Sequence, residues 1–309
     1  MRNDGELVCT DITKIYDTGD RALSSINFSV PTRGVFTLIG RNGAGKTTLT
    51  RILATLLEPT SGVATIDGLD VMNDANELRE RMAVVPQEAR PIPWMTPLQM
   101  ISSYLMWRGI SYRESRRRAE EAVVRVGLED SAHRLSRTLS GGMKRKALVA
   151  MVIAADADFI FLDEPTTGLD PISRQDIWTL LTELGEKRFL FLTTHYLEEA
   201  EMIADRVGIL DDGTLLALGN MDELRMQLGY QYSVRIHGDI DLPPLNGRVL
   251  AGRDGQVQVI TTHDEAMYLS DRLIDRNVKF SVNPITLEDI FYHVVGRDID
   301  TENRWGWIR

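Results

Sequence analysis

The segment from Gly40 to Thr47 has the residue types and the spacing of a loop that binds phosphate groups. Gly40, Gly45, Lys46 and Thr47 occupy the fixed positions of the pattern G-x-x-x-x-G-K-[ST]. Glycines let the backbone wrap closely around phosphate oxygens, and successive N–H groups at a helix start attract anions. We therefore expect Lys46 to contact the β- and γ-phosphates of a nucleotide and the Thr47 hydroxyl to coordinate Mg²⁺.

Two adjacent acids follow an apolar run further along the chain, in Phe159-Ile-Phe-Leu-Asp163-Glu164. A buried strand would present these acids at its carboxyl end, where α/β sheets bind ligands. Asp163 suits Mg²⁺, either directly or through water, and Glu164 suits a general base that polarises an attacking water. Alone this pattern is weak, but it complements the phosphate loop.

A third segment, Leu139-Ser140-Gly141-Gly142, lies between these two motifs. Two glycines at a helix start make a second anion-binding end. In their order and context the three motifs resemble the ATPase subunits of ATP-binding cassette (ABC) transporters over about residues 6–225. The resemblance implies ATP and Mg²⁺ as cofactors, and contact of Ser140, Gly141 and Gly142 with the ATP of a partner subunit. It extends the ATP contacts to the rest of the phosphate loop: Arg41, Asn42, Gly43, Ala44 and Thr48.

The same resemblance assigns four isolated residues, each of which alone would be an ordinary core or surface residue. Tyr16 matches an aromatic that stacks on adenine, and His195 matches a histidine that contacts the γ-phosphate. Gln87 matches a glutamine that touches Mg²⁺ and water and relays to the membrane subunit. Asp170, in Gly168-Leu-Asp170, matches a loop that crosses the dimer interface. Glu164, His195 and Gln87 are thus the predicted catalytic residues, and Thr47, Gln87 and Asp163 the predicted metal ligands.

Alternating strand and helix signals predict an α/β phosphate-loop ATPase core, and helices are predicted over about 46–57, 113–126 and 196–204. Residues 88–155 are predicted to form a mostly helical subdomain. Thr96, Ser140, Asp170 and Asn220 are predicted helix starts. We place a domain boundary at 228/229. Residues 229–309 form a predicted small α+β module, with strands at 232–236 and 256–261 and helices at 264–276 and 286–295.

The composition excludes several classes of protein. The chain has 309 residues, 43% hydrophobic and 26% charged, which disfavours disorder. Its net charge of −10 argues against broad nucleic-acid binding. The single cysteine, Cys9, excludes an intrachain disulfide and is predicted to be a small buried hydrophobe. The N-terminus lacks the apolar stretch of a signal peptide, and the longest uncharged run, 91–107, is too short and proline-rich for a spanning helix.

The resemblance to ABC transporter ATPase subunits implies a subunit that lies on the cytoplasmic face of a membrane. It also implies that the subunit binds an integral membrane permease and a second ATPase subunit, either identical or related. The run 91–107 contains Trp94 and Met95, which are predicted to contact the permease unless they belong to the core.

The direction of transport is predicted from two short segments. Residues 139–146, LSGGMKRK, and the tail element at 283–291 both resemble exporter ATPases whose membrane part is a separate chain. An importer ATPase with a regulatory module remains an alternative, as does a soluble ABC ATPase that acts on nucleic acid or ribosomes. Trp305 and Trp307 near the C-terminus are either a docking tail or incidental.

Overall fold

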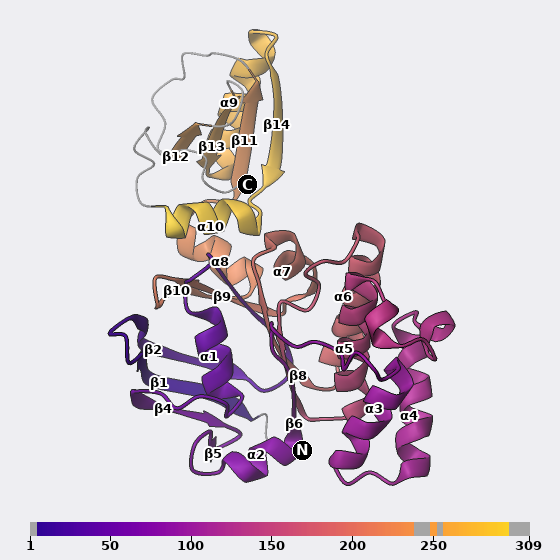
Figure 1. Cartoon of the computed structure of the whole chain (residues 1–309). Coiled ribbons are helices and arrows are strands. Elements are labelled where there is room, and N and C mark those ends of the chain that lie inside the picture. Colours follow the sequence, from indigo (N-terminus) through magenta and orange to yellow (C-terminus); the bar gives the residue numbers. More distant parts are fainter. Residues whose placement is uncertain (1–4, 238–247, 252–255, 297–309) are drawn as a thin grey trace. The chain divides into compact units, whose positions relative to one another are not determined.

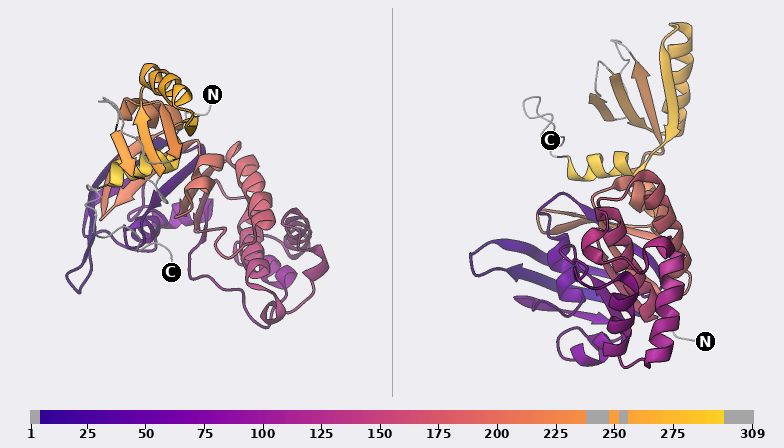
Figure 2. Two further views of the ribbon diagram at one scale, coloured as in Figure 1. Left: turned by 90° about the horizontal axis from the view of Figure 1, so that it is seen from above. Right: turned by 45° about the vertical axis from the view of Figure 1, so that its right-hand side comes forward.

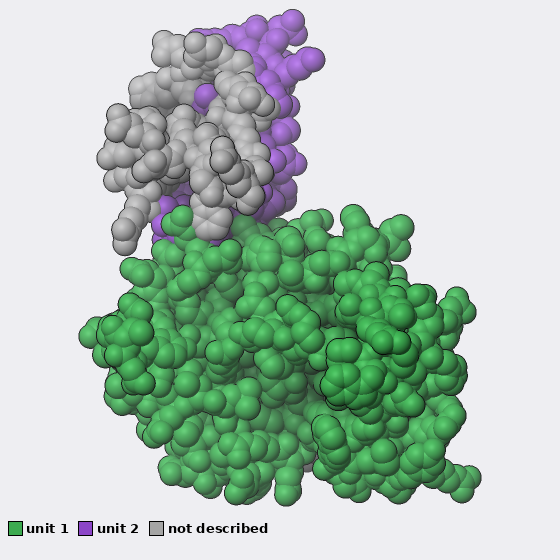
Figure 3. All heavy atoms as spheres, in the orientation of Figure 1, with its two compact units in different colours: residues 1–218 green, residues 219–309 purple. Residues whose placement is uncertain are grey.

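The computed structural model describes residues 5–237, 248–251 and 256–296. Trp305 and Trp307 lie outside these residues. The chain divides into two compact units, Met1–Leu218 and Gly219–Arg309 (Figure 3). The division falls earlier than the boundary predicted at 228/229, because helix α8 (Met221–Leu228) belongs to the second unit. There it packs against α10 (Leu287–Val295), and Arg225 Nε donates a hydrogen bond to the Ile285 carbonyl at 3.0 Å.

The first unit is built on a six-stranded sheet with the order β10-β9-β3-β8-β7-β6. Its strands are β3 (Gly34–Gly40), β6 (Met82–Val85), β7 (Phe159–Asp163), β8 (Phe189–Thr194), β9 (Arg206–Asp211) and β10 (Thr214–Gly219). The central strands β3, β8 and β7 are parallel neighbours, and β6 is parallel to β7. This is the α/β fold predicted from the sequence.

Alternation along β7 and β8 divides their side chains between two hydrophobic cores, one on each face of the sheet. The phenylalanines of both strands pack on one face, and Ile160, Leu162, Leu190 and Leu192 pack on the other. The rings form a continuous row: Phe161 contacts Phe191 at a centroid distance of 5.4 Å, and Phe191 contacts Phe36 at 5.3 Å. Burying each such ring contributes about 1.5–3 kcal/mol, so the alternation fixes which face each helix covers.

The phenylalanine face is covered by helix α1 (Lys46–Leu53) and by an antiparallel sheet with the order β2-β1-β4-β5. Its strands are β1 (Glu6–Ile15), β2 (Arg21–Pro31), β4 (Ser61–Ile66) and β5 (Leu69–Asp70), and helix α2 (Ala75–Arg81) follows them. Cys9 is buried in β1, as predicted, and burial raises the pKa of its thiol.

The leucine face is covered by α3 (Pro97–Trp107), α4 (Tyr112–Arg125), α5 (Gly141–Ala155) and α6 (Pro171–Gly185). Helices α3, α4 and α5 pack on one another within the region predicted to be helical. Thr96 caps α3 in a capping box with Gln99, and the side chains of Ser140 and Asp170 cap α5 and α6. In Figures 1 and 2 the indigo antiparallel sheet and the magenta helices α3 and α4 lie on opposite sides of this unit.

The second unit contains a four-stranded antiparallel sheet with the order β12-β13-β11-β14 and the helix α9 (His263–Asp275) packed against it. The strands are β11 (Tyr232–His237), β12 (Arg248–Ala251), β13 (Gln256–Thr261) and β14 (Lys279–Pro284). Its core contains Val234, Ile236, Val259 and Leu269. A capping box formed by Asn220 and Glu223 opens α8, as the sequence predicted.

Four elements differ from the sequence-based expectation. Helix α1 ends at Leu53 rather than near Leu57, because the backbone turns at Thr55, which has a φ of 61°. Helix α2 and the strands β12 and β14 were not predicted. Helix α2 is short and buries only Leu78, and β14 is mostly exposed, so the hydrophobic patterns of α2 and β14 are weak. None of the helices in the described part of the chain combines the length and apolar character needed to cross a bilayer.

The two-unit division predicts that a chain truncated after Gly229 retains the nucleotide site. Every predicted nucleotide contact precedes this residue, so we expect the truncated protein to fold and to bind ATP with an affinity close to that of the full chain. Circular dichroism checks folding, and a fluorescent ATP analogue measures affinity. A folded truncated protein that no longer binds ATP would contradict the modular interpretation.

Candidate nucleotide-binding and hydrolysis site

The ends of three parallel strands bring the predicted motifs together. Ile39 on β3 pairs with Thr194 on β8, and Asp163 on β7 pairs with Thr193 on β8. The phosphate loop follows β3, Asp163 ends β7, and His195 follows β8. Because carboxyl ends of parallel strands meet at one edge of the sheet, these three motifs converge there.

The phosphate loop leads directly into α1, as its sequence predicts. Gly45 has a φ of 104°, and a Cβ at this position would lie 2.5 Å from the Ala22 carbonyl oxygen, so only glycine fits. Lys46 is buried and its Nζ donates hydrogen bonds to the carbonyls of Gly40 and Arg41, at 2.7 and 3.0 Å. Burial lowers the pKa of Lys46, while Glu164 and Asp163 raise it. The ammonium group therefore lies between the loop and the two acids.

Tyr16 and Gln87 lie near the same edge on different elements. The Tyr16 hydroxyl is 3.2 Å from Thr48 Oγ1, within hydrogen-bond distance of the first turn of α1, and its ring is 37% exposed. Such a ring can stack on a base. Gln87 is exposed and follows the end of β6, the strand next to β7. The structure thus leaves both side chains accessible to a bound nucleotide.

Glu164 and His195 form a hydrogen-bonded pair, with His195 Nδ1 3.0 Å from Glu164 Oε1. The Thr167 hydroxyl donates to the other carboxylate oxygen at 3.0 Å. The pKa of Glu164 is lowered, mainly by the hydrogen bond with His195, against the opposing effect of burial. Asp163 is also buried and accepts a hydrogen bond from the Thr193 hydroxyl. An ionised carboxylate that is fixed in this way can orient and deprotonate a water molecule.

The backbone of Glu164 is held in an unusual conformation, with a φ of 51°. Such values are uncommon for residues other than glycine and persist when the surroundings enforce them. The buried guanidinium of Arg145 supplies part of this constraint, because it donates hydrogen bonds to the carbonyls of Asp163, Glu164 and Pro165. Sequence analysis missed Arg145. The only signal was a charged residue at a buried position of a largely apolar helix.

Helix α5 also carries the third motif. Ser140 and Gly141 are exposed, and the Ser140 side chain accepts a hydrogen bond from the Met143 N–H. A Cβ on Gly142 would lie 3.3 Å from Leu169 Cδ2, so this motif packs against the loop that contains Asp170. Asp170 itself is exposed and caps α6. No hydrogen bond among the described residues joins residues 140–142 to Lys46, Glu164 or His195, and helices α1 and α5 cover opposite faces of the sheet.

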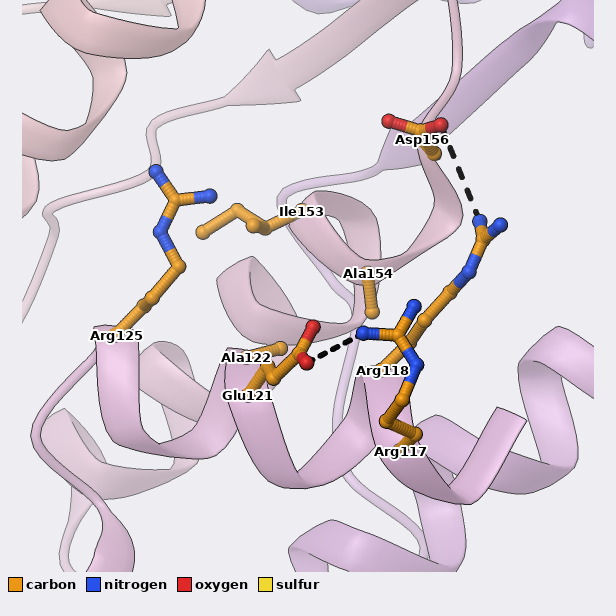
Figure 4. Close-up of a pocket in the computed structure, with 8 residues that line it drawn as sticks. All are labelled: Arg117, Arg118, Glu121, Ala122, Arg125, Ile153, Ala154 and Asp156. Atoms are coloured by element: carbon orange, nitrogen blue, oxygen red, sulfur yellow. Dashed lines mark hydrogen bonds and ion pairs between the residues drawn. The ribbon is translucent and has the colours of Figure 1, made fainter. Parts of the chain in front are cut away.

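A hollow of about 240 Å³ lies between α4 and the C-terminal end of α5 (Figure 4). The charged groups that line it are paired: Arg117 pairs with Glu121, Arg118 with Asp156, and Arg125 with Glu183 outside the lining. The nucleotide motifs contribute none of its lining residues. We therefore interpret it as a salt-bridged junction between helices.

A phosphate loop, a carboxylate pair and a histidine at one edge of a parallel sheet define an α/β ATPase. The family model described as "ABC transporter" matches residues 23–167. The chain is 33% identical over 315 residues to the daunorubicin/doxorubicin resistance ATP-binding protein DrrA of Streptomyces peucetius, covering 94% of this chain and 92% of that protein. The chain belongs to the ABC transporter family, as one of its ATP-hydrolysing subunits.

Some other relatives are much longer. ABC transporter A family member 10 of Arabidopsis thaliana is 36% identical over 73% of this chain, which spans 26% of that protein. Among solved structures, the dimeric bacterial ABC transporter cassette MJ0796 aligns with a TM-score of 0.65 and 26% identity, over 70% of this chain and 98% of that one. The same cassette is known in a post-hydrolysis state bound to ADP and Pi.

Replacing Lys46 by alanine should abolish ATP binding, because the phosphates lose their buried cationic partner. Charge-assisted hydrogen bonds of about 1.5–3 kcal/mol each predict a loss of affinity of at least ~100-fold. Nucleotide affinity is measured directly, and Lys187→Ala, at an exposed lysine, serves as the matched control. A Lys46→Ala protein with unchanged affinity would show that residues 40–47 do not hold the phosphates.

Proposed function

We propose that this chain is the ATPase of an exporter and that it powers a separate membrane subunit. The observation that carries the proposal is the cluster of Lys46, Asp163, Glu164 and His195 at one sheet edge, in a chain that matches DrrA along nearly its whole length. DrrA is named as a drug-resistance ATP-binding protein. Its match to this chain extends beyond the nucleotide-binding core, which favours the exporter over the importer alternative.

The residues present fit ATP with Mg²⁺. The hydroxyl of Thr47, the carboxylate of Asp163 and the side-chain amide of Gln87 are oxygen donors of the kind that Mg²⁺ prefers. When bound, Mg²⁺ would neutralise the phosphate charge that develops during transfer. Lys46 holds the β- and γ-phosphates, Tyr16 stacks on adenine, Glu164 accepts a proton from the attacking water, and His195 keeps the Glu164 carboxylate oriented toward the γ-phosphate.

Two copies of the chain should form the complete ATPase. Ser140 and Gly141 are exposed and start a helix on the sheet face opposite α1, so they are available to the ATP of a partner. Their free N–H groups at the start of α5 would attract its γ-phosphate. Asp170 lies in the loop beside them and would reach the same interface. The MJ0796 cassette, which has this fold, is dimeric.

The membrane subunit should dock beside Gln87, which places this chain at the cytoplasmic face of the membrane. Trp94 is 74% exposed, and an indole at the surface is a favourable contact for a partner protein. Met95, by contrast, packs partly against the core formed by α3, α5 and their neighbours. The docking proposal therefore rests on Trp94 rather than on Met95.

Replacing Glu164 by glutamine should leave ATP binding intact and slow hydrolysis at least ~100-fold, because an amide cannot accept the proton of the attacking water. ATP then stays bound, and the protein should accumulate as a dimer that size-exclusion chromatography with ATP detects. The same protein without nucleotide is the control. Wild-type turnover by Glu164→Gln would exclude Glu164 as the base.

Replacing Trp94 by serine should weaken co-purification with the membrane subunit but leave ATP binding by the isolated chain unchanged. Trp107→Ser is a matched control, because Trp107 is 81% exposed and lies at the C-terminal end of α3, a helix about 16 Å long that begins after Trp94. Equal co-purification of the Trp94→Ser protein and the wild type would exclude docking at this residue.

A further inference from the structure

Glu199, on helix α7 (Leu197–Ile203), is a buried acid that the proposed reaction leaves without a role. It is 1% exposed. One of its oxygens, Oε1, accepts hydrogen bonds from the Thr166 hydroxyl at 2.8 Å and from the Trp178 indole N–H at 3.0 Å. Glu199 therefore joins three segments that are distant in sequence.

Two of these segments carry the Glu164–His195 pair. Thr166 follows Glu164 by two residues, and α7, which carries Glu199, begins two residues after His195. Trp178 is buried in α6, the third segment, and provides a fixed point. The 3.0 Å contact between His195 and Glu164 depends on the relative position of the first two segments, and Glu199 connects them, because it lies on one and is hydrogen-bonded to the other.

The conformation of Glu164 needs such anchoring on both sides. Its φ of 51° is unfavourable for a residue with a side chain. Arg145 holds the carbonyls of residues 163–165 from α5, and Glu199 holds Thr166, the next residue, from α7. With both anchors the segment that carries Glu164 is fixed at consecutive positions.

The surroundings of Glu199 make a buried carboxyl group energetically unfavourable at this position. Its second oxygen, Oε2, has no hydrogen-bond partner among the described residues, and burial raises the pKa of its carboxyl group. The opposing cations around it include Arg174, whose guanidinium packs 4.3 Å from the centroid of the Tyr196 ring. An apolar residue of similar size would avoid this desolvation cost, so packing alone does not explain an acid at this position.

We propose that Glu199 is a positioning residue of the ATPase reaction: by bonding Thr166 from α7, the helix that follows His195, it keeps Glu164 and His195 in a fixed relative position. This inference rests on the proposed role of Glu164. It assigns Glu199 no contact with nucleotide, so its loss should change the rate of hydrolysis and not the affinity for ATP.

The test compares Glu199→Leu, Glu199→Gln and the control Glu198→Leu, which alters an exposed acid on the same helix. Small misplacements of catalytic groups cost up to about 100-fold in rate, so kcat of Glu199→Leu should fall by about 10- to 100-fold. Its dissociation constant for ATP should stay within about twofold, because the phosphate loop is untouched. Glu199→Gln keeps the accepting oxygen and should retain most of the activity, and Glu198→Leu should behave as wild type.

A second variant, Thr166→Val, removes the hydroxyl bonded to Glu199 and keeps the side-chain shape. If Glu199→Leu does not fold, the same measurements are made on Thr166→Val. In a Glu164→Gln background, where the base is already lost, either substitution should cause no further loss of rate. Wild-type kcat in both variants, or an equal loss of ATP affinity, would overturn the inference. Wild-type activity of Glu164→Gln alone would instead overturn the proposed role of Glu164.

Discussion

Three neighbouring strands, β3, β8 and β7, run parallel and end in register, and the arrangement of the site depends on that alignment. The strands are fixed by the alternation of their side chains, since the phenylalanines of β7 and β8 pack on one face of the sheet and the leucines on the other. A slip of one residue would turn each side chain into the opposite core. The same packing that stabilises the sheet therefore places the phosphate loop, Glu164 and His195 at one edge.

The site contains energetically unfavourable features, and the surrounding structure must offset their cost. Glu164 has a positive φ, and Lys46, Arg145, Asp163 and Glu199 are buried charged or titratable groups. Each would be costly alone. Arg145 donates hydrogen bonds to backbone carbonyls, and Asp163 and one oxygen of Glu199 accept hydrogen bonds from threonine hydroxyls. The hydrogen bonds of Arg145 and Glu199 connect α5, α7 and, through Trp178, α6 to the segment after β7, so the supporting helices and the proposed catalytic residues form one network.

The sequence predicted the groups that are proposed to touch nucleotide but not the groups that hold them in place. Some patterns are local, because the residues that define them lie within a few positions of one another. These are the phosphate loop, Asp163-Glu164 and the caps at Thr96 and Asn220. Arg145 and Glu199 act across 18 to 33 residues of chain, and only the folded structure brings their partners together. The boundary between the units was predicted too late for a similar reason: α8 follows the first unit in sequence but packs against α10.

The site in one chain has a base, a lysine and a histidine, while Ser140 and Gly141 lie exposed at the start of α5. The central claim is that this motif completes the site of a second copy. Cross-linking tests it directly: Asn42→Cys and Ser140→Cys are introduced into separate chains that also carry Cys9→Ser, which removes the one native cysteine. The two chains are mixed with ATP and a short bismaleimide. The account predicts a covalent dimer that forms only with ATP; chains that bind ATP and yet give no cross-linked dimer would contradict it.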